Sequence, residues 1–134
     1  MKFEVFNVVF FEKKDLEKAL EKLFPKQKEV LVNVVFISEE EMKKLNKNFR
    51  GKDEITDVLS FKISEELAEI YICSEYIKKS FKNFEKEIIR MIIHGVLHIK
   101  GYDHKGYFYE DSVDEEIFKL QEKYLKEFYD ILEK

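Results

Sequence analysis

The sequence predicts a single domain in which strands and helices share one hydrophobic core, spanning residues 1–134. A chain of 134 residues fits one domain, and its hydrophobic content is 45%. Thirteen Phe and seven Tyr favour compact folding over disorder. Short apolar runs typical of strands alternate with segments of helical periodicity, without repeats or an interdomain linker.

The first part of the chain predicts two strands, each followed by a helix. Residues 2–11 are rich in Val and Phe and predict the first strand. A helix ending near Pro25 follows, because apolar residues recur at i, i+3, i+4 and i+7: Leu16, Ala19, Leu20 and Leu23. Residues 29–37 are almost continuously apolar, as in a strand covered on both faces.

Ser38 and Glu41 form a capping box that predicts a short helix with Met42 and Leu45 on its apolar side. We expect a loop over 46–54, because the apolar periodicity stops there. A strand is predicted near 57–63.

The remainder of the chain predicts one more strand and three helices. The strand covers 69–73, with Ala68, Ile70 and Ile72 on one face, and Ser74 and Asn83 are candidate N-caps of the next two helices. The helix over 84–100 is apolar nearly all round, so we expect it at the centre of the domain. A final helix is predicted over 112–132, packed by Val113, Ile117, Leu120, Tyr124, Phe128 and Leu132.

Charge and cysteine content exclude several classes of protein. The formal net charge of −4 is not the footprint of a general nucleic-acid binder, although residues 43–52 hold a local basic cluster. No apolar run approaches the roughly 20 residues of a membrane span, and the N-terminus does not resemble a signal peptide. The single cysteine, Cys73, excludes an intrachain disulfide and suits a reducing cytoplasm. We therefore expect a soluble cytoplasmic protein.

All three histidines of the chain lie between residues 94 and 104. His94 and His98 are four residues apart, so a helix places both imidazoles on one face. A continuous helix would carry His104 to another face, but Gly101 can end the helix in a left-handed conformation and return His104 to the same point. Three imidazoles with an open fourth position are the ligands of a catalytic zinc ion. The alternative interpretation is that the three histidines are unrelated and that one of them is a hydrogen-bonded core residue.

The same histidine spacing occurs in metzincin zinc proteases, which carry a glutamate directly after the first histidine as general base. Here that residue is Gly95, which cannot accept a proton. The spacing favours a metallopeptidase or another metallohydrolase, whereas the missing base argues against peptide hydrolysis.

Three segments resemble the YbeY family, the metal-dependent endoribonucleases of ribosomal RNA maturation. Residues 94–104, HGVLHIKGYDH, are similar to the family signature HGxLHLxGYDH. Residues 45–61, LNKNFRGKDEITDVLSF, are similar to LNxxYRxKDxPTDVLSFP, and residues 68–73 fall where the family has a GDIxIS strand. Length and element order also match. The departures from the family pattern are Ile55 and Lys62, at positions where the family usually has proline, and Ile117, which stands about where many members have a methionine after the third histidine.

The resemblance implies an α+β, zincin-like fold with a mixed four-stranded sheet packed against helices. It maps His94, His98 and His104 onto the family's metal ligands and Arg50 onto its functional arginine. The implied cofactor is one divalent metal ion per chain, with zinc favoured, although imidazole also suits nickel, copper and iron. The implied substrate is single-stranded ribosomal RNA of the small subunit, with the ribosomal particle, a ribosomal protein or a GTPase as partners, and no membrane or DNA. A non-catalytic ribosome-assembly factor with structural zinc is a further alternative.

Overall fold

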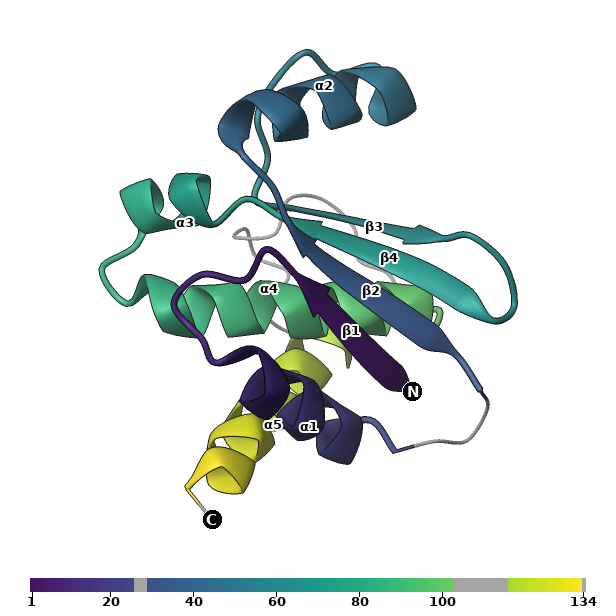
Figure 1. Ribbon diagram of the computed structural model, residues 1–134, viewed down its shortest axis with the longest axis vertical. Coiled ribbons are helices and arrows are strands. Elements are labelled where there is room, and N and C mark those ends of the chain that lie inside the picture. The colour runs from purple at the N-terminus through teal and green to yellow at the C-terminus, as the bar shows by residue number, and fades with distance from the viewer. Residues whose placement is uncertain (26–28, 103–115, 134) are drawn as a thin grey trace.

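The computed structural model describes residues 1–25, 29–102 and 116–133, which form a four-stranded sheet and five helices (Figure 1). The elements in chain order are β1 (Lys2–Phe6), α1 (Lys13–Leu23), β2 (Leu31–Phe36), α2 (Glu39–Arg50), β3 (Val58–Lys62), β4 (Leu67–Ile72), α3 (Ser74–Ser80), α4 (Phe84–Ile99) and α5 (Glu116–Leu132). The strand order in the sheet is β1-β2-β4-β3. β1, β2 and β4 are parallel and β3 is antiparallel to β4, which confirms the expected α+β fold with a mixed sheet.

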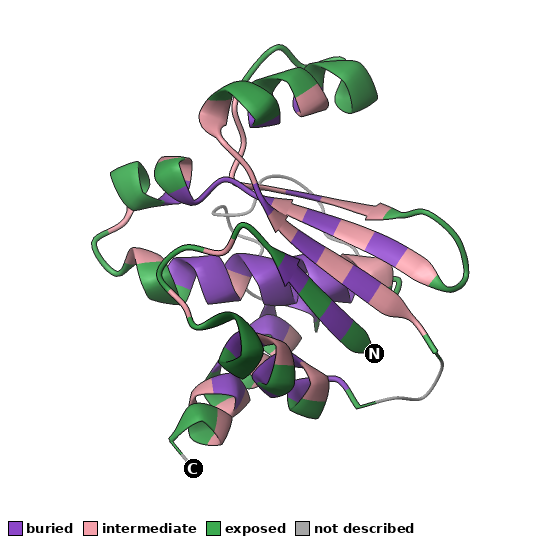
Figure 2. Cartoon of the chain, in the orientation of Figure 1, coloured by how far each residue is buried: buried purple, intermediate pink, exposed green. Residues whose placement is uncertain are grey.

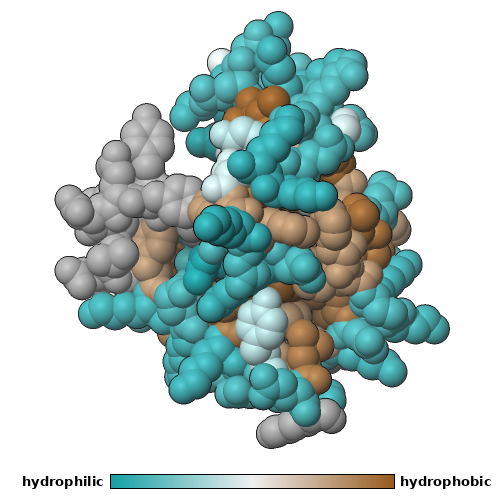
Figure 3. Space-filling model, turned by 90° about the vertical axis from the view of Figure 1, so that its left-hand side faces the viewer, coloured by the Kyte–Doolittle hydropathy of each residue, from teal (hydrophilic) through white to brown (hydrophobic). Residues whose placement is uncertain are grey.

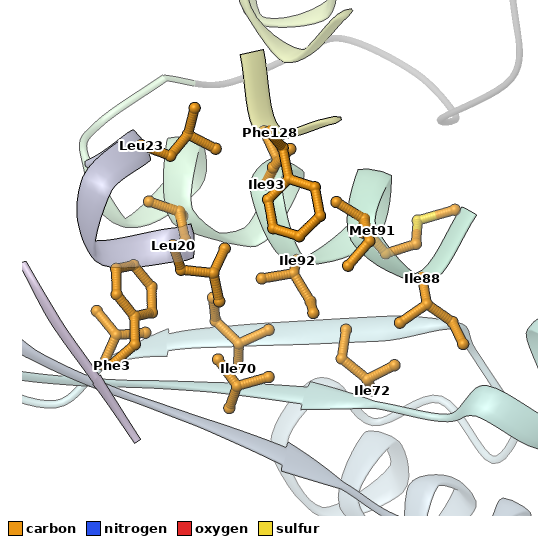
Figure 4. Packing of buried hydrophobic residues seen from close by; sticks show 14 of the residues in the cluster. Phe3, Leu20, Leu23, Ile70, Ile72, Ile88, Met91, Ile92, Ile93 and Phe128 are labelled. Atoms are coloured by element: carbon orange, nitrogen blue, oxygen red, sulfur yellow. The ribbon is translucent and has the colours of Figure 1, made fainter. Parts of the chain in front are cut away.

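One face of the sheet is covered by α1 and α4, α5 packs against these two helices, and the main core lies between these layers (Figure 1). The face of β4 that holds Ala68, Ile70 and Ile72 points into this core, as predicted. Figure 4 shows Ile70 and Ile72 packed beneath Ile88 and Ile92 of α4. α4 is the central layer, because it contacts both β3 and β4 on one side and α5 on the other.

The opposite face of the sheet carries α2 and a smaller apolar cluster. Met42 of α2 packs with Leu59 of β3 and with Cys73, all of them buried. Leu59 is paired with Tyr71, whereas the core residue Ile72 is paired with Val58, so Leu59 and Ile72 point to opposite faces. α2 and α4 therefore lie on different sides of the sheet, and burial is concentrated on the α4 side (Figure 2).

Several predicted boundaries were wrong. β1 ends at Phe6, and residues 7–11 form a loop in which Asn7 and Phe10 have positive φ angles. The apolar residues of this loop suggested a longer strand, but Phe10 packs edge-on against Phe84, with ring centroids 4.8 Å apart. α2 continues to Arg50 instead of ending before residue 46, because the left-handed Gly51 is what stops it.

The structure also differs from the sequence-based expectation in finer details. Alternate residues of β2 are only partly buried, so the strand is fully covered on one face only. Ser74 is the first residue of α3 and Cys73 is its N-cap, while Asn83 is the N-cap of α4 without a side-chain capping bond. On α5, Ile117 and Phe128 are buried and Leu120 and Tyr124 pack against the core, as predicted, whereas Leu132 is exposed. The buried residues of this helix also include Phe118, Gln121 and Leu125. Residues 112–115 lie outside the described residues.

The surface view in Figure 3 is mostly hydrophilic, with hydrophobic side chains exposed in patches between hydrophilic ones. Among the described helices, none is both long and apolar enough to cross a membrane.

Candidate functional site

α4 carries His94 and His98 through the middle of the domain. Its residues from Glu87 to Leu97 are almost all buried, which agrees with the expectation that it is the central helix. Gly95 lets this helix approach the sheet closely. A Cβ atom at Gly95 would lie 3.1 Å from Ile70 Cδ1 and Cγ2, so there is no room for a larger residue without displacement. The position that holds the protease glutamate therefore faces an apolar strand here.

The two histidines face each other, as their spacing predicts. His94 Nε2 and His98 Nε2 are 2.9 Å apart, and the ring centroids are 4.5 Å apart. His94 is 4% exposed, whereas His98 is partly exposed. One buried and one more accessible imidazole thus present nitrogen atoms to a common point.

His94 also contacts a residue of α5. Its Nδ1 atom lies 2.8 Å from Gln121 Oε1, in a contact that is fully buried. Gln121 Nε2 donates a hydrogen bond of 3.1 Å to Glu122 Oε2. Glu122 accepts two further hydrogen bonds from Arg90, from Nε at 2.9 Å and from Nη2 at 3.0 Å, and Arg90 also pairs with Glu87.

The Glu122 carboxylate is stabilised by its hydrogen-bond partners. Burial would raise the pKa of Glu122, but the hydrogen bonds from Arg90 and Gln121 outweigh it and hold the pKa below its ordinary value. Glu122 is therefore a carboxylate at neutral pH, and it can fix the guanidinium of Arg90 and the amide of Gln121 together.

Gly101 ends α4 as predicted. Its φ angle is +102°, its N–H donates to the carbonyl of His98, and the N–H of Tyr102 donates to the carbonyl of Leu97, each at 3.0 Å. This pair of hydrogen bonds is a Schellman motif. The chain turns away from the helix axis directly after the histidine pair. His104, the third predicted ligand, lies outside the described residues.

Arg50 is the last residue of α2, and its side chain is exposed. Within residues 1–25, 29–102 and 116–133, no carboxylate lies within ion-pair distance of it. The structure brings the two histidines together on α4, whereas Arg50 ends a helix that packs on the other face of the sheet.

The histidine pair suits a divalent metal ion in donor type and in orientation. Zinc with nitrogen bonds of about 2.0–2.1 Å spaces two tetrahedral ligands about 3.3 Å apart, so the pair would open by about 0.4 Å. In the described part of the chain, no group of three His, Cys, Asp or Glu side chains could hold a metal ion. Cys73 is buried on the other side of the sheet, and burial raises the pKa of its thiol, so it behaves as a small apolar residue.

Sequence reasoning missed Gln121. A signal was present, because Gln121 lies one turn from both Ile117 and Leu125 and so interrupts an apolar stripe of α5. A polar residue at such a position needs a buried partner. The sequence does not say which one.

Fold and site together define a small α+β protein with paired imidazoles on its central helix. Residues 7–129 match the family model described as Endoribonuclease YbeY. The chain therefore belongs to the YbeY family.

Individual relatives agree with this assignment. The Endoribonuclease YbeY of Thermotoga maritima is 43% identical over 122 residues, which cover 86% of this chain and 79% of the relative. The Endoribonuclease YbeY of Phytoplasma australiense is 34% identical, with 94% of each chain covered. The solution structure of TM1509 from Thermotoga maritima superposes with a TM-score of 0.69 at 36% identity, covering 98% of this chain and 91% of that one.

Proposed function

We propose that this chain is a metal-dependent endoribonuclease that cleaves single-stranded segments of small-subunit ribosomal RNA during maturation and quality control of the ribosome. The observation that carries the proposal is the facing pair His94 and His98, with Nε2 atoms 2.9 Å apart on a buried helix. Relatives of this chain over most of its length are named endoribonucleases, which supports RNA as the substrate.

His94 and His98 would hold one divalent ion, with His104 as third ligand and zinc as the favoured metal. When bound, such an ion would supply a Lewis acid for a phosphoryl oxygen and would lower the pKa of water in the site, to about 7 in favourable zinc sites. The protein's own part is to keep the site rigid and partly dry. α4 does this by its packing on β3 and β4.

Arg50 would bind the phosphodiester backbone of the RNA. A guanidinium offers a planar fork that matches phosphate oxygens, and the exposed Arg50 has no carboxylate partner among the described residues. Lys43 and Lys47 precede it on α2 at helical spacing and would add local attraction for a polyanion.

The proposed setting is the cytoplasm, with the ribosomal particle as the source of substrate and a ribosomal protein or a GTPase as further partners. Peptide hydrolysis is not favoured. Gly95 offers no base, and its close contact with Ile70 leaves no space for a carboxylate side chain.

The decisive experiment combines metal analysis with cleavage of a single-stranded RNA. We expect about one metal ion per chain in the wild type. His98→Ala should lose both the metal ion and the cleavage of RNA. Arg50→Ala should keep the metal and the fold but lower cleavage by about 10²-fold, as for loss of a charge-stabilising group, and Arg50→Lys should recover part of it.

Lys44→Ala is the matched control for Arg50, because Lys44 lies on the same helix, is exposed and is paired with Glu40. It should cleave RNA like the wild type. Wild-type protein that binds metal without cleaving RNA would favour a non-catalytic assembly factor, and robust peptide hydrolysis would favour a peptidase. Full activity in Arg50→Ala would remove Arg50 from the proposal.

A further inference from the structure

Gln121 is a buried polar residue on an apolar face of α5. Only 3% of it is exposed, and its neighbours one turn away, Ile117 and Leu125, are core residues. Burying an amide costs free energy unless both of its ends find hydrogen-bond partners. Gln121 has both, because Oε1 meets His94 Nδ1 at 2.8 Å and Nε2 meets Glu122 Oε2 at 3.1 Å.

The orientation of the Gln121 amide follows from its two partners. The Glu122 carboxylate can only accept, so the NH₂ group of Gln121 must face it. Rotating the amide by half a turn would place the Gln121 oxygen against a carboxylate oxygen. Arg90 fixes Glu122 in turn with two hydrogen bonds, so the carboxylate cannot easily turn away. The Gln121 oxygen is therefore held toward His94.

An oxygen that only accepts requires a proton on the nitrogen that it contacts. The neutral imidazole of His94 must therefore carry its single N–H proton on Nδ1. This leaves a lone pair on Nε2, the atom that faces His98 Nε2 at 2.9 Å. This is the tautomer that an imidazole needs when it binds a metal through Nε2.

We infer that Gln121 is a positioning residue that holds His94 in the Nδ1–H tautomer and aims its Nε2 lone pair at the proposed metal. Arg90 and Glu122 serve the same end by orienting the Gln121 amide. The inference rests on the proposed function only for the metal, because the tautomer of His94 is a property of the chain itself.

Two variants separate hydrogen bonding from packing. Gln121→Met keeps the length of the side chain but replaces the amide with a thioether, which is only a weak acceptor. Gln121→Glu keeps a strong acceptor for the Nδ1 proton. Leu125→Met is the matched control, because Leu125 is buried one turn further along α5.

The first readout is the tautomer of His94, from two-bond ¹H–¹⁵N correlation spectra of the metal-free protein at about pH 8, where free imidazole is neutral. We expect the proton on Nδ1 in the wild type, in Gln121→Glu and in Leu125→Met, and a shift toward Nε2–H in Gln121→Met. The second readout is the zinc dissociation constant. It should rise by about 10- to 100-fold in Gln121→Met and much less in Gln121→Glu and Leu125→Met.

A wild-type spectrum with the His94 proton on Nε2 overturns the inference without any variant, so it stays testable even if Gln121→Met does not fold. Wild-type tautomer and affinity in a folded Gln121→Met would overturn it as well. If the wild type binds no zinc, the proposed metal site fails, while the spectra still decide the role of Gln121.

Discussion

Gly101 has a backbone conformation that residues with a Cβ atom rarely adopt. Its φ angle is +102°, and a Cβ atom there would meet no other atom within 4 Å. Any cost of substitution must therefore come from the backbone. We expect Gly101→Ala to lower the free energy of unfolding by about 1–2 kcal/mol, measured by urea denaturation. Lys100→Arg, at an exposed neighbour with an ordinary helical φ angle, keeps a cation over the Phe24 ring and should have little effect. Equal stability of Gly101→Ala and wild type would contradict the left-handed turn.

Glu122 gives the molecule a specific response to acid. Its pKa in the folded state lies below its ordinary value because Arg90 and Gln121 stabilise the carboxylate against the effect of burial. Its contribution to stability is therefore fully present above the ordinary glutamate value of about 4.3, and it is lost as pH falls through the lower folded value. Glu122→Gln should lose less stability than the wild type between pH 7 and pH 3, measured by chemical denaturation. Glu127→Gln on the same helix should behave like the wild type.

At the scale of the element, α4 depends on its close packing at Gly95. Alanine there would gain about 1 kcal/mol of helix propensity but lose about 1–3 kcal/mol by overpacking against Ile70. We expect a net loss of about 1 kcal/mol for Gly95→Ala. Ile70→Val, which removes the Cδ1 atom, should relieve part of the clash.

A double-mutant cycle tests this contact. Gly95→Ala with Ile70→Val should be about 1 kcal/mol more stable than the sum of the two single changes predicts, because residues in contact couple. Strict additivity would show that α4 shifts as a whole instead of meeting Ile70.

At the scale of the whole molecule, the core is complete without the histidine site. Phe3, Leu20, Ile70, Ile92 and Phe128 come from five different elements and are buried in one cluster (Figure 4). We therefore expect the protein to stay folded when a chelator removes the metal, unlike a zinc finger. Zinc at 100 times its dissociation constant should add about 2.7 kcal/mol of stability. Calorimetry with and without zinc measures this difference, and His98→Ala should abolish it. Unfolding by the chelator would show that the metal is structural.

Features that depend on a few neighbouring residues could be predicted from the sequence. The capping box of Ser38 and Glu41, the shared helix face of His94 and His98, and the turn at Gly101 each involve hydrogen bonds or spacings within two helical turns. Boundaries without such local chemistry were predicted less well. The apolar run after Phe6 reads as strand, but its residues pack as a loop.

The sequence by itself determined the family, the class of fold and the pair of histidines, because long motifs and helical periodicity are written in local order. Only the tertiary structure decided which residues meet across elements. Gln121 reaches His94 from 27 residues away because α5 packs on α4. Gly95 has little free space because α4 lies directly on Ile70. The helix that ends at Arg50 packs on the opposite face of the sheet from α4. These outcomes follow from the strand order β1-β2-β4-β3 and from how helices cross the sheet, and no periodicity along a single chain encodes either.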